Sequence, residues 1–247
     1  MKTSMFLIAA LIGAAPMGMT PAAPLPSAAL PLPAPTATDV GDADSFGHGV
    51  VFLGQIQTLS VGLHSSCVGN DQTRQRCVTL VPNGQTSFAE SDLGVIRLPA
   101  RATRTLLCTN AMLFLNTESA NHDSSPAMQS LSFTADVTVE NPVLDDPSLI
   151  NPRTGTAFNG TLQIGVVGFF ERHTMAAGAF EQSNDGKAAV CTAGLRKSVL
   201  MQVYGLSDAL ATQFFRRPMV VHFGANGATE LVDGAQLFYS VRLYGDE

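Results

Sequence analysis

The segment SLSFTADVTVEN, residues 130–141, alternates between apolar and polar side chains more regularly than the rest of the chain. Its apolar positions are Leu131, Phe133, Ala135, Val137 and Val139. Because successive side chains of a strand point to opposite faces, this period of two predicts a strand with one buried and one solvated face. Strands of this kind are typical of antiparallel sheets.

Segments on both sides of residues 130–141 have the same character. They are rich in β-branched and aromatic residues and end at turn-forming residues, which is typical of strands; they span residues 49–64, 77–82, 93–99, 103–117, 161–173, 218–224 and 235–245. In the last segment, the predicted buried side chains are Leu237, Tyr239, Val241 and Leu243. Residues 121–126 predict a turn with exposed polar side chains, and residues 183–186 (SNDG) predict a hairpin turn.

Residues 195–217 have a pattern that favours helix instead. Ser207 is a good N-cap for a helix whose apolar face includes Leu210 and Phe214. Arg216 and Arg217 follow at its C-terminal end, where positive charge is favourable, before a proline ends the helix. We expect a kinked pair of helices in this region.

Together these patterns predict a mainly β fold. We expect a two-sheet antiparallel sandwich of jelly-roll or Greek-key type, with one helical insertion near residues 195–217. About 200 residues follow the N-terminal segments, which suits one domain with a sizeable core. We therefore assign residues 45–247 to a single β-sandwich domain.

The start of the chain has the features of an exported protein. Lys2 precedes an unbroken apolar run from Met5 to Ala15, which is too short to span a membrane and matches a secretory signal peptide. Seven of the 14 prolines lie between Pro16 and Pro35, in a stretch that has little to bury. We predict a signal peptide over residues 1–23 and a disordered, extended Pro/Ala-rich tether over residues 24–44.

The four cysteines, Cys67, Cys77, Cys108 and Cys191, all follow the tether. An even number in an exported chain predicts two disulfides, although four cysteines allow three pairings. We favour Cys67 with Cys77, because turn-forming residues between them would close a hairpin-like loop, and Cys108 with Cys191 by elimination. Zinc binding is disfavoured, because the chain has no CxxC and no HxxxH motif.

Charge and aromatic content exclude or disfavour three classes of ligand. Without Lys2, 13 basic residues stand against 20 acidic ones, a formal net charge of −7. A protein of this sign is repelled by nucleic acid and by anionic lipid. The chain has no tryptophan and 3 tyrosines, which disfavours carbohydrate as a ligand, because sugar sites rely on broad aromatic platforms that only phenylalanine could partly replace here.

The candidate catalytic residues are His64, His173 and His222, which lie in or at the end of predicted strands. The chain has no GxSxG elbow, so a hydrolase would have to assemble its site from distant residues. Asp136 and Glu140 share the polar face of one predicted strand, but about 13 Å of strand rise separates them. Two of the histidines within about 4 Å of each other, or of a carboxylate in a cleft, would favour a hydrolase.

Residues 141–160, NPVLDDPSLINPRTGTAFNG, connect two predicted strands and are dense in turn-forming residues. Asp145 and Asp146 are candidate calcium ligands, but adjacent carboxylates without a third acidic residue nearby more often cap a short turn. The apolar residues of the segment favour an ordered, partly buried crossover of the Ω type.

These observations favour an exported, non-catalytic β-sandwich that is a structural or interaction component of the bacterial envelope or cell surface, either secreted or periplasmic. One alternative is a secreted hydrolase whose distant histidine and carboxylate residues meet in the fold. Another is a subunit that self-assembles into a filament or surface layer through edge strands. We expect no cofactor, no nucleic-acid partner and no transmembrane segment in the mature chain; the expected partners are proteins or further copies of the chain.

Overall fold

The computed structural model describes residues 49–67, 74–81, 84–164 and 168–246, and only the backbone of residues 108–113 and 187–193. These residues belong to one of the two units into which the chain divides, Thr36–Glu247; the other is Met1–Pro35. The predicted signal peptide and tether lie outside the described residues and stay predictions.

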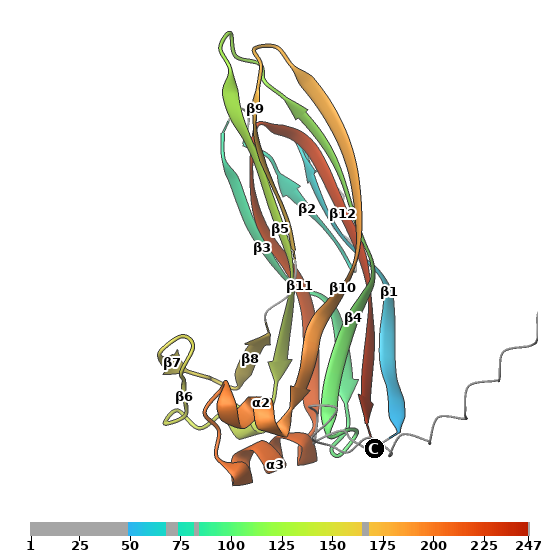
Figure 1. Ribbon diagram of the computed structural model, residues 1–247, viewed down its shortest axis with the longest axis vertical. Helices are drawn as coiled ribbons and strands as arrows, with labels where there is room; N and C mark the ends of the chain where they lie inside the picture. Colours follow the sequence, from blue (N-terminus) through green and yellow to red (C-terminus); the bar gives the residue numbers. More distant parts are fainter. Residues whose placement is uncertain (1–48, 68–73, 82–83, 165–167, 247) are drawn as a thin grey trace, which may run out of the picture. The chain divides into compact units, whose positions relative to one another are not determined.

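Two sheets form a sandwich (Figure 1). Sheet A has the strand order β10 (Phe180–Arg196), β4 (Thr105–Ala120), β12 (Val232–Asp246), β1 (Val50–His64) and β2 (Gln75–Thr79). Sheet B has the order β3 (Thr86–Leu98), β11 (Met219–Glu230) and β5 (Ala127–Glu140), and both β8 (Thr161–Ile164) and β9 (Gly168–Met175) pair with β5. A small hairpin contains β6 (Ile150–Asn151) and β7 (Thr156–Ala157). The predicted mainly β, antiparallel sandwich is confirmed, except that β1 and β2 are parallel.

Strand β5 contains the alternating segment, and its apolar face lies in the core as predicted. All five of the predicted residues, Leu131 to Val139, are at most 2% exposed. The strand pairs with β11 without a register shift from Ser130 to Glu140, so the alternation is kept along its length. The four side chains predicted for β12, Leu237 to Leu243, are equally buried and belong to the same hydrophobic cluster.

Tyr239 joins the two sheets through a hydrogen bond inside this core. Its hydroxyl, on β12, donates to the carbonyl oxygen of Gly224 on β11 at 2.7 Å. Burial raises the pKa of the Tyr239 phenol well above its usual value of 10.0, and the nearby charge of Asp136 adds to the shift. The phenol is therefore held in its neutral, hydrogen-bonding form.

The predicted helical insertion is confirmed and covers one end of the sandwich (Figure 1). It contains α2 (Lys197–Gln202) and α3 (Asp208–Arg216), with a break before the N-cap Ser207, whose side chain accepts a hydrogen bond from the Leu210 amide at 3.3 Å. The buried face of α3 includes Phe214 and Phe215. The 3₁₀ helix η1 (Pro142–Leu144) lies next to α3. Its N-cap residue, Asn141, donates from its side-chain amide to the Phe214 carbonyl oxygen at 2.9 Å.

The predicted hairpin turn at residues 183–186 is wrong. Residues 183–186 form no hairpin turn but lie within β10, because pairing with β4 outweighs their turn propensity. Ser183 and Thr117 share a hydrogen bond of 2.6 Å across this pair, and the chain reverses earlier, at residues 176–179. The described residues of the predicted strand 161–173 all lie in strands, β8 and β9, which pair with successive stretches of β5; residues 165–167 lie outside the described part of the chain.

Asn121 ties together the two loops that cross from sheet A to sheet B. One loop joins β4 to β5 and the other joins β9 to β10. The side-chain amide of Asn121 donates to the carbonyl oxygens of Ser125, Met175 and Ala176 at 2.9–3.2 Å. The turn over residues 121–126 is therefore present, but the prediction that its polar side chains are exposed is wrong for Asn121, which is 1% exposed.

The predicted disulfide between Cys67 and Cys77 is present, with Cα atoms 5.5 Å apart. The loop that it closes is not hairpin-like, because the strands on either side, β1 and β2, are parallel. The backbone pairing of β4 with β10 places Cys108 opposite Thr192, next to Cys191. The sulfur atoms of Cys108 and Cys191 lie outside the described side chains, so their disulfide stays a prediction.

Replacing Tyr239 with Phe should cost about 1 kcal/mol of unfolding free energy at neutral pH, the net value of one hydrogen bond. The folded-state pKa lies above the unfolded value of 10.0, so the phenol's contribution is complete below that pH and is lost as the pH rises above it. The wild type should therefore lose stability at alkaline pH more steeply than Tyr239→Phe.

Urea unfolding at about pH 7 and about pH 11 measures both effects. Tyr244→Phe is the control, because Tyr244 lies half-buried on the outer face of β12. Equal alkaline losses in the wild type and Tyr239→Phe would contradict the role of the buried phenol.

Candidate functional site

His222 lies between two carboxylates on the outer face of sheet B. It comes from β11, and its Nδ1 bonds to Asp92 on β3 while its Nε2 bonds to Glu140 on β5, the latter at 3.1 Å. The cluster therefore joins three neighbouring strands. A neutral imidazole has one N–H, so full hydrogen bonding to both carboxylates requires the protonated ring.

A bulge in β3 brings Asp92 to this histidine. The pairing of β3 with β11 shifts between Gly94 and Glu90, so that residues 91–93 lie opposite Gly224. Asp92 has a φ of 55°, in the left-handed region. A Cβ at Gly224 would lie 2.4 Å from the Glu90 carbonyl oxygen, so only glycine permits this close approach of the two strands. The bulge thereby directs a charged side chain toward His222.

The His222 cluster lies in a surface hollow of about 490 Å³. The residues around it include Glu90, Asp136, Thr138 and Gln163. Asp136 and Glu140, predicted to share a polar face, thus line one hollow together with His222 of β11. This arrangement meets the distance condition for a hydrolase, but both ring nitrogens already bond to carboxylates, so neither is open toward a substrate.

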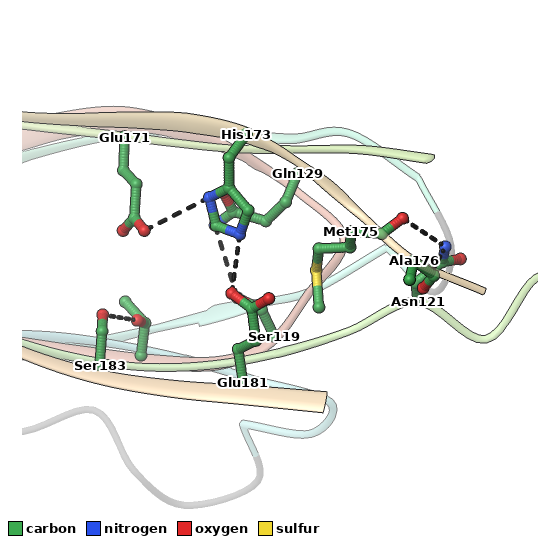
Figure 2. Close-up of polar contacts among 10 residues, drawn as sticks. Ser119, Asn121, Gln129, Glu171, His173, Met175, Ala176, Glu181 and Ser183 are labelled. Atoms are coloured by element: carbon green, nitrogen blue, oxygen red, sulfur yellow. Dashed lines mark hydrogen bonds and ion pairs between the residues drawn. The ribbon is translucent and has the colours of Figure 1, made fainter. Parts of the chain in front are cut away.

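His173 lies in a second cluster, between the sheets (Figure 2). Its Nδ1 is 3.5 Å from Glu171, also on β9, and its Nε2 is 2.7 Å from Glu181 on β10. Because β9 belongs to sheet B and β10 to sheet A, the His173–Glu181 pair connects the two sheets. Both ring nitrogens therefore face carboxylates, and the Nε2–Glu181 contact is a hydrogen bond.

A buried polar layer adjoins this second cluster. Gln129 on β5 is 1% exposed and lies opposite His173 in the β5–β9 pairing. Its amide nitrogen is 3.4 Å from the hydroxyl of Ser119 on β4, and Figure 2 shows both side chains between the sheets. The Gln129 Oε1 atom has no hydrogen-bond partner among the described residues. The core therefore changes from apolar to polar toward the loops that Asn121 connects.

The three candidate histidines do not form one site. His64 lies at the end of β1 on the outer face of sheet A, and His222 lies on the outer face of sheet B, so the sandwich separates them. His173 lies between the sheets. The sequence indicated His222 and, separately, Asp92, Asp136 and Glu140 among the candidate carboxylates, but not that Asp92 and Glu140 meet at His222, because the position of Asp92 depends on the bulge.

The segment over residues 141–160 is an ordered connection, and Asp146 caps a turn in it. The Asp146 carboxylate accepts hydrogen bonds from the Ser148 hydroxyl at 2.7 Å and from the Ser148 amide at 2.9 Å. Both bonds lower the pKa of Asp146 below its usual 3.8, and the bond from the Ser148 hydroxyl has the larger effect. Within the described part of the chain, no three His, Cys, Asp or Glu residues are arranged to hold a metal ion, Asp145 and Asp146 included.

The comparisons give no relative from which to infer a function. The chain matches no protein-family model, and a search of curated proteins found no similar sequence. Among the described residues, no helix is long and apolar enough to cross a membrane.

We predict that Asp146→Ala will lower the unfolding temperature slightly at neutral pH, because the variant loses both bonds from Ser148. The folded pKa of Asp146 lies below 3.8, so its contribution is present above that pH and is lost as the pH falls through the folded pKa. The difference from the wild type should therefore disappear in strong acid.

Thermal unfolding with and without EDTA tests this interpretation against calcium binding. Asp145→Ala, which changes the neighbouring exposed carboxylate, is the control. If EDTA lowers the unfolding temperature of the wild type but not of Asp146→Ala, the carboxylate binds a metal ion and the capping role is wrong.

Proposed function

We propose that the protein is an exported, non-catalytic β-sandwich that acts as a structural or interaction component of the bacterial envelope or cell surface. The Cys67–Cys77 disulfide supports export, because disulfides persist in oxidising compartments. The apolar run and Pro/Ala-rich stretch at the start of the chain support it independently.

The contacts of the histidines with carboxylates are the observation that supports the non-catalytic part of the proposal. His222 hydrogen-bonds through both ring nitrogens to carboxylates on the two neighbouring strands. His173 hydrogen-bonds through Nε2 to Glu181 on the other sheet, and its Nδ1 lies 3.5 Å from the Glu171 carboxylate. A general base needs one nitrogen directed at the group that it deprotonates. The His222 imidazole instead connects three strands of one sheet, and the His173 imidazole connects the two sheets.

Self-association is one form that an interaction role could take. Strand β1 pairs with β2 only from Ser60 to His64, so its earlier part presents an edge that no described strand covers. Val50 and Phe52 on this part are 81% and 56% exposed, and β1 contains no Asp, Glu, Lys or Arg. Uncharged edges of this kind favour pairing with another chain.

Export is tested by a charge placed in the apolar run. Leu11→Arg should abolish cleavage and leave the protein in the cytoplasm, because a signal peptide requires an uninterrupted apolar segment. Leu25→Arg, in the Pro/Ala-rich stretch, is the matched control and should be exported like the wild type. Cell fractionation locates the protein. The N-terminus of the recovered protein and the oxidation state of Cys67 and Cys77 are then determined. Equal localisation of Leu11→Arg and the wild type would contradict export.

A hydrolase centred on His222 is the second candidate function. The hollow of about 490 Å³ supports it, because several carboxylates surround the histidine there. In that case a substrate would have to displace Glu140 from Nε2, leaving Asp92 on Nδ1 to orient the ring.

His222→Gln separates the two functions. On the non-catalytic proposal, the wild type hydrolyses no member of a panel of chromogenic esters, glycosides, phosphates and peptides. His222→Gln then loses about 1 kcal/mol of stability, because its two partly exposed contacts with carboxylates are removed. His122→Gln, which removes the exposed pair between His122 and Asp233, is the control. Hydrolysis that is abolished in His222→Gln and retained in His122→Gln would establish the hydrolase instead.

A further inference from the structure

Three adjacent strands of sheet A present an ordered set of polar side chains on the outer face of the sandwich. The strands are β12, β4 and β10, which lie side by side in Figure 1. The pairing aligns Gln236, Asn116 and Asn184 in one row across them. The row on one side contains Gly234, Glu118 and Gln182, and the row on the other side contains Phe238, Phe114 and Gly186. We refer to these nine positions as the amide face.

The alternation of each strand sets the direction of these side chains. Leu237 on β12 and Leu115 and Thr117 on β4 are buried between the sheets, so their immediate neighbours point outward. Asn116, Glu118, Gln182 and Asn184 are exposed, and Gln236 is partly exposed. The amide face is therefore accessible from solvent and lies on the opposite side of sheet A from the core.

Four primary amides occur on this face, and most of their hydrogen-bonding capacity is directed outward. Gln182 donates to the Glu118 carboxylate at 3.0 Å. The side chains of Asn116, Asn184 and Gln236 make no hydrogen bond to any described residue. Each amide offers two N–H donors and an acceptor oxygen, so together they form an array of paired donors and acceptors.

Glycines make the amide face hollow and allow large side chains to lie flat against it. A hollow of about 360 Å³ is lined by four amide side chains together with His64 and Gly234. A Cβ at Gly62 would lie 2.7 Å from His64 Nε2 and 3.5 Å from Gln236 Oε1, so both side chains lie over this glycine. The Phe114 ring covers Gly186 in the same way, at 3.1 Å from the position of a Cβ.

The chemistry of this face fits an uncharged ligand rich in hydroxyl groups. Among its nine positions, Glu118 is the charged residue, and none is Lys or Arg. Phe114 is 42% exposed and presents an aromatic ring beside the amides. Neighbouring hydroxyls of a sugar can each accept from and donate to an amide, while the apolar face of the sugar ring packs on an aromatic ring. An anionic polymer would be repelled by Glu118 and by the net negative charge of the chain.

We propose that the amide face binds a neutral, extended glycan chain, with the amides of Asn116, Asn184 and Gln236 bonding to its hydroxyls and Phe114 packing on a sugar ring. This proposal rests on the proposed function, because the glycan would be the partner of an exported interaction protein. It is distinct from the His222 hollow, which lies on the other sheet. Carbohydrate was disfavoured from composition because the chain has no tryptophan; the exposed position of Phe114 supplies the platform that composition did not indicate.

The test is affinity electrophoresis of the purified, disulfide-bonded protein in native gels that contain a soluble polysaccharide. The probes are dextran, mannan, starch, xylan, β-1,3-glucan and hydroxyethyl cellulose, with alginate as an anionic comparison. Sedimentation with chitin and with peptidoglycan covers insoluble polymers. We expect retardation by, or sedimentation with, at least one neutral polymer and no retardation by alginate.

Two variants assign any binding to the amide face. Asn116→Asp keeps the shape of the side chain but removes its donors and adds charge, so affinity should fall about tenfold or more. Phe114→Ala should weaken binding through loss of the aromatic surface. Gln213→Glu is the matched control: it makes the same kind of change at an exposed amide on α3, away from both the amide face and the His222 hollow, and should bind like the wild type. Thermal unfolding confirms that each variant is folded.

Several outcomes would overturn the glycan site. The first is that the protein binds none of the neutral polymers, and the second is that Asn116→Asp binds as strongly as the wild type. The third is that the protein migrates equally slowly in gels with and without polysaccharide, which would indicate self-association instead. These results are separate from the test of export. A correctly exported protein that binds none of the polymers overturns the glycan site alone, and a glycan-binding protein that stays in the cytoplasm overturns export alone.

Discussion

The packing of alternate apolar side chains between sheets A and B is the interaction on which the rest of the structure depends. Leu131 to Val139 of β5 and Leu237 to Leu243 of β12 are almost completely removed from water, and each large apolar side chain buried in this way contributes about 1.5–3 kcal/mol. Because side chains alternate along a strand, burying one set necessarily presents the other set to solvent. Both outer faces, with the His222 hollow on sheet B and the amide face on sheet A, follow from this constraint.

Polar bonds determine how the two sheets meet toward the loops. In the middle of the sandwich the core is apolar, and Tyr239 joins the two sheets there through a hydrogen bond to the Gly224 carbonyl oxygen. Toward the opposite loops, Gln129, Ser119 and the His173–Glu181 pair replace apolar contacts. Gln129 and Ser119 are buried, and buried polar groups cost free energy unless they are hydrogen-bonded, so the bond between them favours arrangements of the sheets in which it can form. Asn121 has a similar effect, because it binds both crossing loops at once.

Sequence patterns predicted the strands with regular alternation and the capped helix, because in those elements local preference and burial agree. They failed at residues 183–186, where turn-forming residues lie in a strand that is held by its pairing with β4. For the candidate site, composition indicated His222, Asp136 and Glu140, but the bulge that brings Asp92 to the histidine depends on how β3 fits against Gly224 of β11. Such a fit between distant segments leaves no local pattern in the chain.

The sequence by itself determined the class of fold, the position of the helices and the pairing of Cys67 with Cys77, because periodicity, capping and short-range cysteine spacing act between residues that are near one another in the chain. Only the tertiary structure decided which polar side chains share a surface. Gln236, Asn116 and Asn184 lie far apart in sequence and become neighbours because strand register aligns them, and His173 meets Glu181 because consecutive strands belong to different sheets. Register and sheet order depend on the summed packing of the whole core, and no single segment contains that information.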